Sequence, residues 1–154
     1  MKKKHYIKII LLIVVLLLIL YLTLQSPEQT WALTNAVQSF LLHLFPEGTA
    51  PNWITDGKLL RHAAHIPEYF LLGLALCAVF ANKKHGLLLA LLFGLLAGLA
   101  DETLKIFLPT REFSLNDLIF DAIGIALANA LWIVVRYAKT KITKIATGAE
   151  RKRI

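Results

Sequence analysis

Four apolar stretches, each about as long as a membrane-spanning helix, constrain the fold of this chain more than any other feature. They cover residues 7–24, 65–81, 87–108 and 117–135. A helix rises about 1.5 Å per residue, so roughly 20 apolar residues cross a hydrocarbon core about 30 Å thick. The first stretch lacks a small-x-small cleavage site after it, so we interpret it as a retained anchor. We therefore predict an all-α integral membrane protein, a four-helix bundle forming one domain over residues 7–135.

Basic residues are distributed unequally between the two ends of these stretches. Thirteen of the 17 Lys and Arg residues lie in residues 1–8, 82–86 and 136–154, whereas nine of the ten acidic residues lie elsewhere. Lys and Arg are retained on the cytoplasmic side of membranes. We predict a multi-pass protein of the cell membrane with both termini in the cytoplasm: a basic N-terminus (1–6), an outer loop (25–60) and a basic tail. The tail either only fixes this topology, which we favour, or also binds anionic lipid headgroups.

The outer loop predicts a helix of its own. Ser26 is suited to cap it, Pro27 takes the first helical position and Gln29 completes a capping box. Behind them apolar residues keep helical spacing from Leu33 to Leu44, opposite a polar face. Two interpretations remain open: an amphipathic interfacial helix lying on the outer leaflet, or a lid packed over the bundle.

Composition excludes several other classes of protein. The only cysteine, Cys77, lies in an apolar stretch, which excludes an intramolecular disulfide and a cysteine-based zinc site. The formal net charge of +7 comes from bases beside apolar stretches, and no base-reading element accompanies it, so we expect no nucleic-acid partner. The sequence carries no signal for the oligomeric state.

Ionisable residues occur inside three of the predicted spans and at a common depth. Counted along their own helices, His65, Asp101 and Asp121 each lie roughly 6 to 9 Å below the outer boundary. The two aspartates share helical stripes with glycines and alanines, which mark contacts between membrane helices. Because a charge at mid-membrane costs about 2.5 to 3.5 kcal/mol, we predict that these side chains face one another in a polar pocket near the outer surface.

We expect the charges of this pocket to pair with one another. Lys105 follows Asp101 by one helical turn, and Arg61 is expected to pair with Glu68 or with a facing aspartate. A network that merely locks the helices together is the simplest interpretation. Buried ion pairs seldom add net stability compared with apolar packing, so we favour a functional site.

The polar residues of the last three spans fall in three motifs: "RHAAHIPEY" (61–69), "DETLKIFLPTR" (101–111) and "NDLIFDAIG" (116–124). These resemble the VanZ-like family motifs R-K-x-x-H-x-x-E-Y, D-E-x-x-Q-x-x-x-P-G-R and D-x-x-x-N-x-x-G. The departures are His62 for Lys, Lys105 for Gln, Thr110 for Gly and Asp121 for Asn. Lys105 and Asp121 replace neutral amides by opposite charges, which suggests a compensating pair.

The resemblance implies a small multi-span membrane protein. The family's namesake is linked to resistance to the glycopeptide antibiotic teicoplanin.

The first functional hypothesis is binding of a headgroup. Arginine forks match phosphate geometry, and apolar walls suit a lipid tail. The partner would be a membrane lipid or a lipid-linked cell-wall precursor, and binding it would lower glycopeptide susceptibility as the resemblance implies. The residues expected to bind this ligand are Arg61, His65, Glu68, Tyr69, Asp101, Glu102, Lys105, Arg111, Asp117 and Asp121.

Two other hypotheses concern chemistry and transport. An intramembrane hydrolase or transferase acting on a phospho- or glycolipid headgroup would use acids and bases among His65, Glu68, Asp101 and Glu102. His65 and Glu68 form a weak metal pattern, so we expect no metal and no cofactor. Ser114 lacks an oxyanion partner and is a poor nucleophile candidate.

Proton or ion transport is disfavoured because the inner halves of the spans are apolar.

Overall fold

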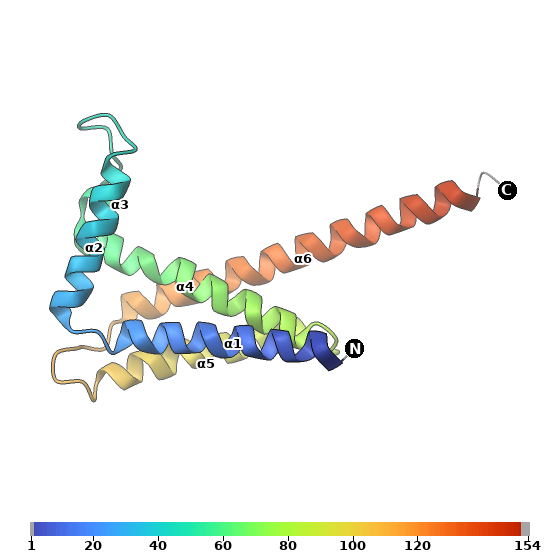
Figure 1. Ribbon diagram of the computed structural model, residues 1–154, viewed down its shortest axis with the longest axis horizontal. Coiled ribbons are helices and arrows are strands. Elements are labelled where there is room, and N and C mark those ends of the chain that lie inside the picture. The colour runs from blue at the N-terminus through green and yellow to red at the C-terminus, as the bar shows by residue number, and fades with distance from the viewer. Residues whose placement is uncertain (1, 152–154) are drawn as a thin grey trace.

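The computed structural model describes the backbone of residues 2–151 and the side chains of residues 5–143. The described chain is all-helical, with no strand among these residues, and Figure 1 shows its arrangement. Its helices are α1 (Lys2–Thr23), α2 (Pro27–Leu42), α3 (Asn52–Thr55), α4 (Gly57–Phe80), α5 (Gly86–Lys105) and α6 (Leu115–Arg151). The all-α fold expected from the sequence is confirmed.

Four helices are long and apolar enough to cross a membrane, namely α1, α4, α5 and the part of α6 up to Thr143. This agrees with the four predicted spans, although their ends differ. α4 begins at Gly57 instead of residue 65, because the Asp56 carboxylate caps it by accepting hydrogen bonds from the backbone N–H groups of Lys58 (2.9 Å) and Leu59 (3.1 Å). α6 continues without a break into the predicted basic tail, whose side chains from residue 144 onward lie outside the described part.

α4 lies at the centre of the bundle, in contact with α1, α5 and α6. Small residues allow α4 and α6 to approach closely. A Cβ added to Gly73 would lie 2.6 Å from the Cβ of Ala128, and one added to Gly124 would lie 2.5 Å from the carbonyl oxygen of Ile66. Below this contact the bundle is filled by an apolar core that includes Ile19, Leu72, Leu76, Cys77 and Ile125. The second half of α6 then diverges from the other helices (Figure 1).

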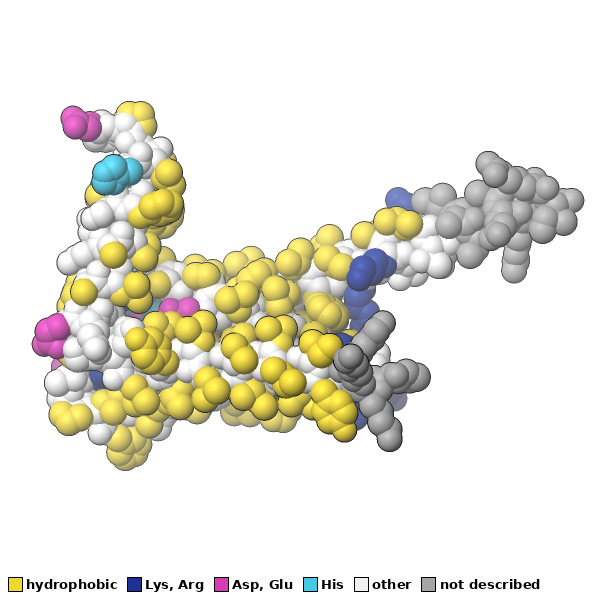
Figure 2. Space-filling view, viewed as in Figure 1, with side chains coloured by type: hydrophobic (Ala, Val, Ile, Leu, Met, Phe, Trp, Pro, Cys, Tyr) yellow, Lys and Arg dark blue, Asp and Glu magenta, His cyan; other side chains and the backbone are white. Residues whose placement is uncertain are grey.

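α2 crosses the end of the bundle where α1 ends (Figure 1). Its predicted capping box is present: the Ser26 hydroxyl accepts from the Gln29 N–H, and the Gln29 side chain accepts from the Ser26 N–H. The polar face packs on the protein, with Thr34 buried and Gln38 Nε2 donating to two carbonyls around α3. Phe40 on the apolar face is 66% exposed. Figure 2 shows apolar atoms along the side of α2 that overhangs the bundle.

The two ends of the bundle differ in charge. Figure 2 shows apolar side chains covering the flanks, Lys and Arg gathered where α1 begins, and acidic side chains around α2 at the opposite end. The many exposed large apolar residues of α1, α5 and α6 agree with contact to lipid acyl chains. Which end faces the cytoplasm stays a prediction from the distribution of Lys and Arg.

Candidate functional site

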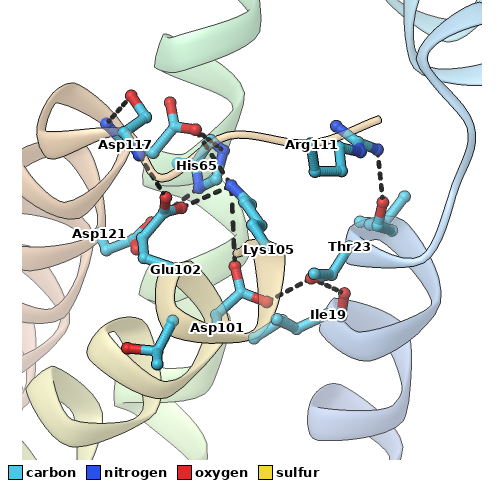
Figure 3. A network of polar contacts seen from close by, with 12 residues as sticks. Ile19, Thr23, His65, Asp101, Glu102, Lys105, Arg111, Asp117 and Asp121 are labelled. Atoms are coloured by element: carbon cyan, nitrogen blue, oxygen red, sulfur yellow. Dashed lines mark hydrogen bonds and ion pairs between the residues drawn. The ribbon is translucent and has the colours of Figure 1, made fainter. Parts of the chain in front are cut away.

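Charged side chains from α5 and α6 are buried together at the α2 end of the bundle (Figure 3). Their exposed fractions are 9% for Asp101, 0% for Glu102, 5% for Lys105, 3% for Asp117 and 1% for Asp121. They come from the last turns of α5 and the first turns of α6. The inward orientation predicted for Asp101 and Asp121 is therefore confirmed. We call these five residues the charged cluster.

Lys105 lies at the centre of the charged cluster. Its Nζ is 2.5 Å from Glu102 Oε1, 3.0 Å from Asp117 Oδ2 and 4.0 Å from Asp101 Oδ2. The predicted pairing with Asp101 is thus the longest of three contacts. The prediction that Lys105 and Asp121 form a compensating pair is wrong. Lys105 contacts Asp117 at the start of α6, and Asp121 is paired with His65.

Backbone groups before α6 complete the environment of these carboxylates. Glu102 Oε2 accepts a hydrogen bond from the Ser114 N–H at 2.9 Å. The Ser114 hydroxyl accepts from the Asp117 N–H at 3.2 Å, as an N-cap of α6 does. Ser114 therefore positions the start of α6.

Two histidines of α4 contact the aspartates of α6. His65 Nδ1 lies 2.8 Å from Asp121 Oδ1, and His65 Nε2 lies 3.5 Å from Asp117 Oδ2. His62 is buried, and its Nδ1 is hydrogen-bonded to Asp117 Oδ1. The sequence analysis missed His62 as a site residue. Its spacing of three residues from His65 and seven from Tyr69 was the available signal, because those positions share one helical face.

α1 also contributes to the site, through a residue that the sequence analysis did not select. The Thr23 hydroxyl is within hydrogen-bond distance of the Ile19 carbonyl (2.9 Å) and of Asp101 Oδ1 (Figure 3). Thr23 is 4% exposed. This contact joins the end of α1 to α5 and holds the Asp101 carboxylate in place.

Arg111 anchors the loop between α5 and α6 to the junction of α1 and α2. Its Nε and Nη2 donate to the Gln25 carbonyl (3.1 and 2.7 Å), and Nη2 also lies 3.3 Å from the Leu22 carbonyl and 2.6 Å from Thr30 Oγ1. Partial burial and the nearby positive charge of Arg61 lower the pKa of Arg111. The Nε and Nη2 groups of Arg111 thus bind the protein, whereas Nη1 has no hydrogen bond to the described residues.

Arg61 does not make the predicted ion pair. Among the described residues it has no pairing with Glu68 or with an aspartate; instead its guanidinium lies 5.9 Å from the centre of the Trp31 ring. Arg61 is in the second turn of α4, beside α2, whereas the acidic residues lie deeper along the bundle. The cation–π contact leaves the N–H edge of the guanidinium available.

A cavity of about 910 Å³ opens beside the charged cluster. We call it the pocket. Seven of the ten predicted ligand-binding residues line it: Arg61, His65, Glu68, Asp101, Lys105, Arg111 and Asp117. Leu33, Val37 and Leu41 of α2 form an apolar wall. Tyr69, Glu102 and Asp121 do not line the pocket; they lie behind it, where Glu102 and Asp121 hold Lys105 and His65.

One group of side chains has the composition of a metal site. Ligand atoms of His65, Glu102 and Asp121 lie within 4.8 Å of one another. The sequence analysis considered His65 with Glu68 instead. A divalent ion would compete with the Lys105 ammonium, which already neutralises Glu102 at 2.5 Å, and with the hydrogen bond between His65 and Asp121.

Three polar atoms near the site are buried without a hydrogen-bond partner among the described residues: Asp121 Oδ2, Tyr69 Oη and His62 Nε2.

Comparison with known proteins identifies a family. Residues 8–136 match the family model described as VanZ/LLP1. The matched region contains the whole pocket and the charged cluster. No curated protein and no solved structure matches the chain.

Proposed function

This chain belongs to the VanZ/LLP1 family of membrane proteins, and from that premise and the chemistry of its pocket we propose that it binds the phosphate-bearing headgroup of a lipid in the bacterial cell envelope. The ligand would be a membrane lipid or a lipid-linked cell-wall precursor. The observation that supports this proposal most is the combination, in one pocket, of arginine side chains with an apolar wall.

The arginines supply the recognition of the headgroup. Arg61 lines the pocket without an ion-pair partner among the described residues, and Arg111 also lines it. Burial first, and then repulsion by Arg61, lower the pKa of Arg111, so the two guanidinium groups lie within electrostatic range of each other. A phosphate between the two would offset that repulsion and accept charge-assisted hydrogen bonds from both. We call Arg61 and Arg111 the cationic rim. Leu33 and Val37 of α2 would contact the first part of the acyl or prenyl chain.

The proposed setting is the outer leaflet of the cell membrane, with both termini in the cytoplasm. The excess of Lys and Arg at the opposite end of the bundle supports this orientation. α2 would then lie at the membrane surface, its apolar side toward the lipid and the pocket. Glycopeptide antibiotics meet their targets at this face of the membrane, so occupation of the pocket by a precursor would lower teicoplanin susceptibility.

Mass spectrometry of the purified protein tests the binding proposal. The wild-type protein and the control Lys83→Gln, which alters an exposed turn, are expected to retain a phosphate-bearing lipid through gel filtration. Arg61→Gln is expected to retain at least tenfold less of it, because the unpaired guanidinium is lost. Equal amounts of the same lipids in all three preparations would contradict the proposal.

One observation favours an intramembrane enzyme as the second candidate. His65 lines the pocket and its Nδ1 is held 2.8 Å from Asp121, an arrangement that orients an imidazole for acid–base chemistry. In a phosphoester hydrolysis, His65 would take a proton from the attacking water, and the leaving oxygen would receive a proton in turn. Release of a soluble headgroup from envelope lipids by the wild type and by His43→Gln, but not by His65→Gln, would support the enzyme. Unchanged lipids would limit the protein to binding.

A further inference from the structure

The pocket contains two opposite charges that have no ion-pair partner among the described residues. Arg61 and Glu68 both belong to α4 and both line the pocket. They are seven residues apart, which places them on one face of the helix with about 10 Å between them along its axis. At that separation the two side chains do not bind each other. A half-buried carboxylate without a cationic partner is costly, and a bound cation would offset that cost.

The two ends of the pocket differ in the charge that they favour. At the cationic rim, Arg61 and Arg111 repel each other. Deeper in the pocket, Glu68 lies within electrostatic range of His65 and Lys105 as well as of Asp101 and Asp121. We call Glu68 and Asp101 the acidic floor. Lys105 is the only lysine of the charged cluster, and three carboxylates share it: Glu102, Asp117 and, at 4.0 Å, Asp101. The acidic floor therefore has spare negative charge, while the cationic rim has spare positive charge.

Proline adds an uncharged acceptor between the cationic rim and the acidic floor. Pro67 lies inside α4 and has no N–H group, so the carbonyl of Ala63 cannot accept the usual hydrogen bond from four residues ahead. Ala63 and Pro67 both line the pocket. A ligand N–H donor that reached this carbonyl would supply the missing hydrogen bond.

We propose that the headgroup bound in this pocket is zwitterionic, with its phosphate at the cationic rim and a primary ammonium at the acidic floor. This inference rests on the proposed function and names its ligand class: an aminoalkyl phosphodiester lipid such as phosphatidylethanolamine. A phosphate and an amine joined by a two-carbon linker, with a charge-assisted contact of about 3 Å at each end, span a length similar to the backbone rise of about 10 Å between residues 61 and 68 of α4. Phosphate lipids without an amine would leave Glu68 unpaired.

The test measures binding of short-chain lipids to the full-length protein in detergent. The wild type is expected to bind phosphatidylethanolamine at least tenfold more tightly than phosphatidylglycerol. Phosphatidylcholine, whose ammonium has no N–H donor, should bind more weakly than phosphatidylethanolamine. Glu68→Gln should lose the preference for the amine, whereas Glu68→Asp and the exposed control Glu28→Gln should keep the preference.

The outcomes separate the two proposals. Equal binding of all three lipids by the wild type would overturn the zwitterionic headgroup and leave the phosphate-binding function standing. An amine preference that persists in Glu68→Gln would overturn the role of the acidic floor. No saturable binding of any of the lipids, with Arg61→Gln indistinguishable from wild type, would overturn the proposed function itself. The comparison of lipids on the wild type keeps the test decisive even where a variant does not fold.

Discussion

Replacing Lys105 by methionine should destabilise the protein strongly. The substitution keeps the length and apolar body of the side chain but removes the ammonium that lies 2.5 Å from Glu102 and 3.0 Å from Asp117. Lys105 is 5% exposed, so its loss would leave buried carboxylates without their cation. Removing one partner of a buried ion pair costs about 3–5 kcal/mol. At about 2–4 °C per kcal/mol for a chain of this size, the midpoint of thermal unfolding should fall by roughly 6 to 20 °C.

Thermal unfolding in one detergent, followed by tryptophan fluorescence, measures this effect. Lys83→Met is the matched control, since it makes the same chemical change in an exposed turn and should shift the midpoint little. The double variant Lys105→Met, Glu102→Gln should recover part of the loss, because the amide needs no cation. A Lys105→Met protein as stable as Lys83→Met would refute the reasoning, and so would a double variant whose losses simply add.

Two further predictions concern packing and the loop between α5 and α6. Gly124→Ala places a Cβ 2.5 Å from the Ile66 carbonyl oxygen and should lower the free energy of unfolding by about 1–3 kcal/mol in the same assay. The control Gly57→Ala should be tolerated, because its nearest contact would be 3.4 Å. Equal stability of the two variants would contradict the close approach of α4 and α6. Arg111→Met removes the hydrogen bonds that tie the loop to the end of α1 and should speed amide hydrogen exchange in residues 106–114. Unchanged exchange in these residues would show that Arg111 does not hold the loop in place.

The features that could be predicted from the sequence are those that depend on neighbouring residues. A span needs a run of apolar residues of fixed length, and that requirement predicts all four membrane-length helices. The capping box of α2 needs only Ser26 and Gln29 at the right spacing. The meeting of the charged residues followed from equal depth on separate helices, because an isolated charge in lipid is too costly.

The partners of individual charges could not be predicted in the same way. A lysine side chain is long enough to reach several acids, so Lys105 selects Glu102 and Asp117 according to the packing of α5 on α6, which spacing along one helix does not reveal. Arg61 turned out to lie over Trp31 because α2 folds back over the end of α4. That contact depends on a loop path for which the sequence carries no local signal.

The polar residues of α4 lie on two overlapping stripes of the helix. One passes through Arg61, His65 and Glu68, and the other through His62, His65 and Tyr69, of which His62 and Tyr69 are buried in the structure. Neighbouring residues differ by about 100° around a helix, so two stripes that share His65 are separated by only part of a turn. Polar residues on both stripes made them hard to distinguish by pattern alone, and only the contact with Asp117 of α6 identifies His62 as inward.

The central claim is that charged side chains of α4 and α6 meet inside the bundle, and a solid-state NMR distance measurement in lipid bilayers tests it most directly. The protein would carry ¹⁵N in its histidine rings and ¹³C in its aspartate carboxyl groups, in a His62→Gln background that leaves the pair of His65 and Asp121, 2.8 Å apart, as the shortest such contact. The structure predicts a strong dipolar coupling that falls in Asp121→Asn to the weaker coupling of His65 with Asp117, whose Oδ2 lies 3.5 Å from His65 Nε2. A folded protein with no coupling between histidine nitrogen and aspartate carboxyl carbon would contradict the account.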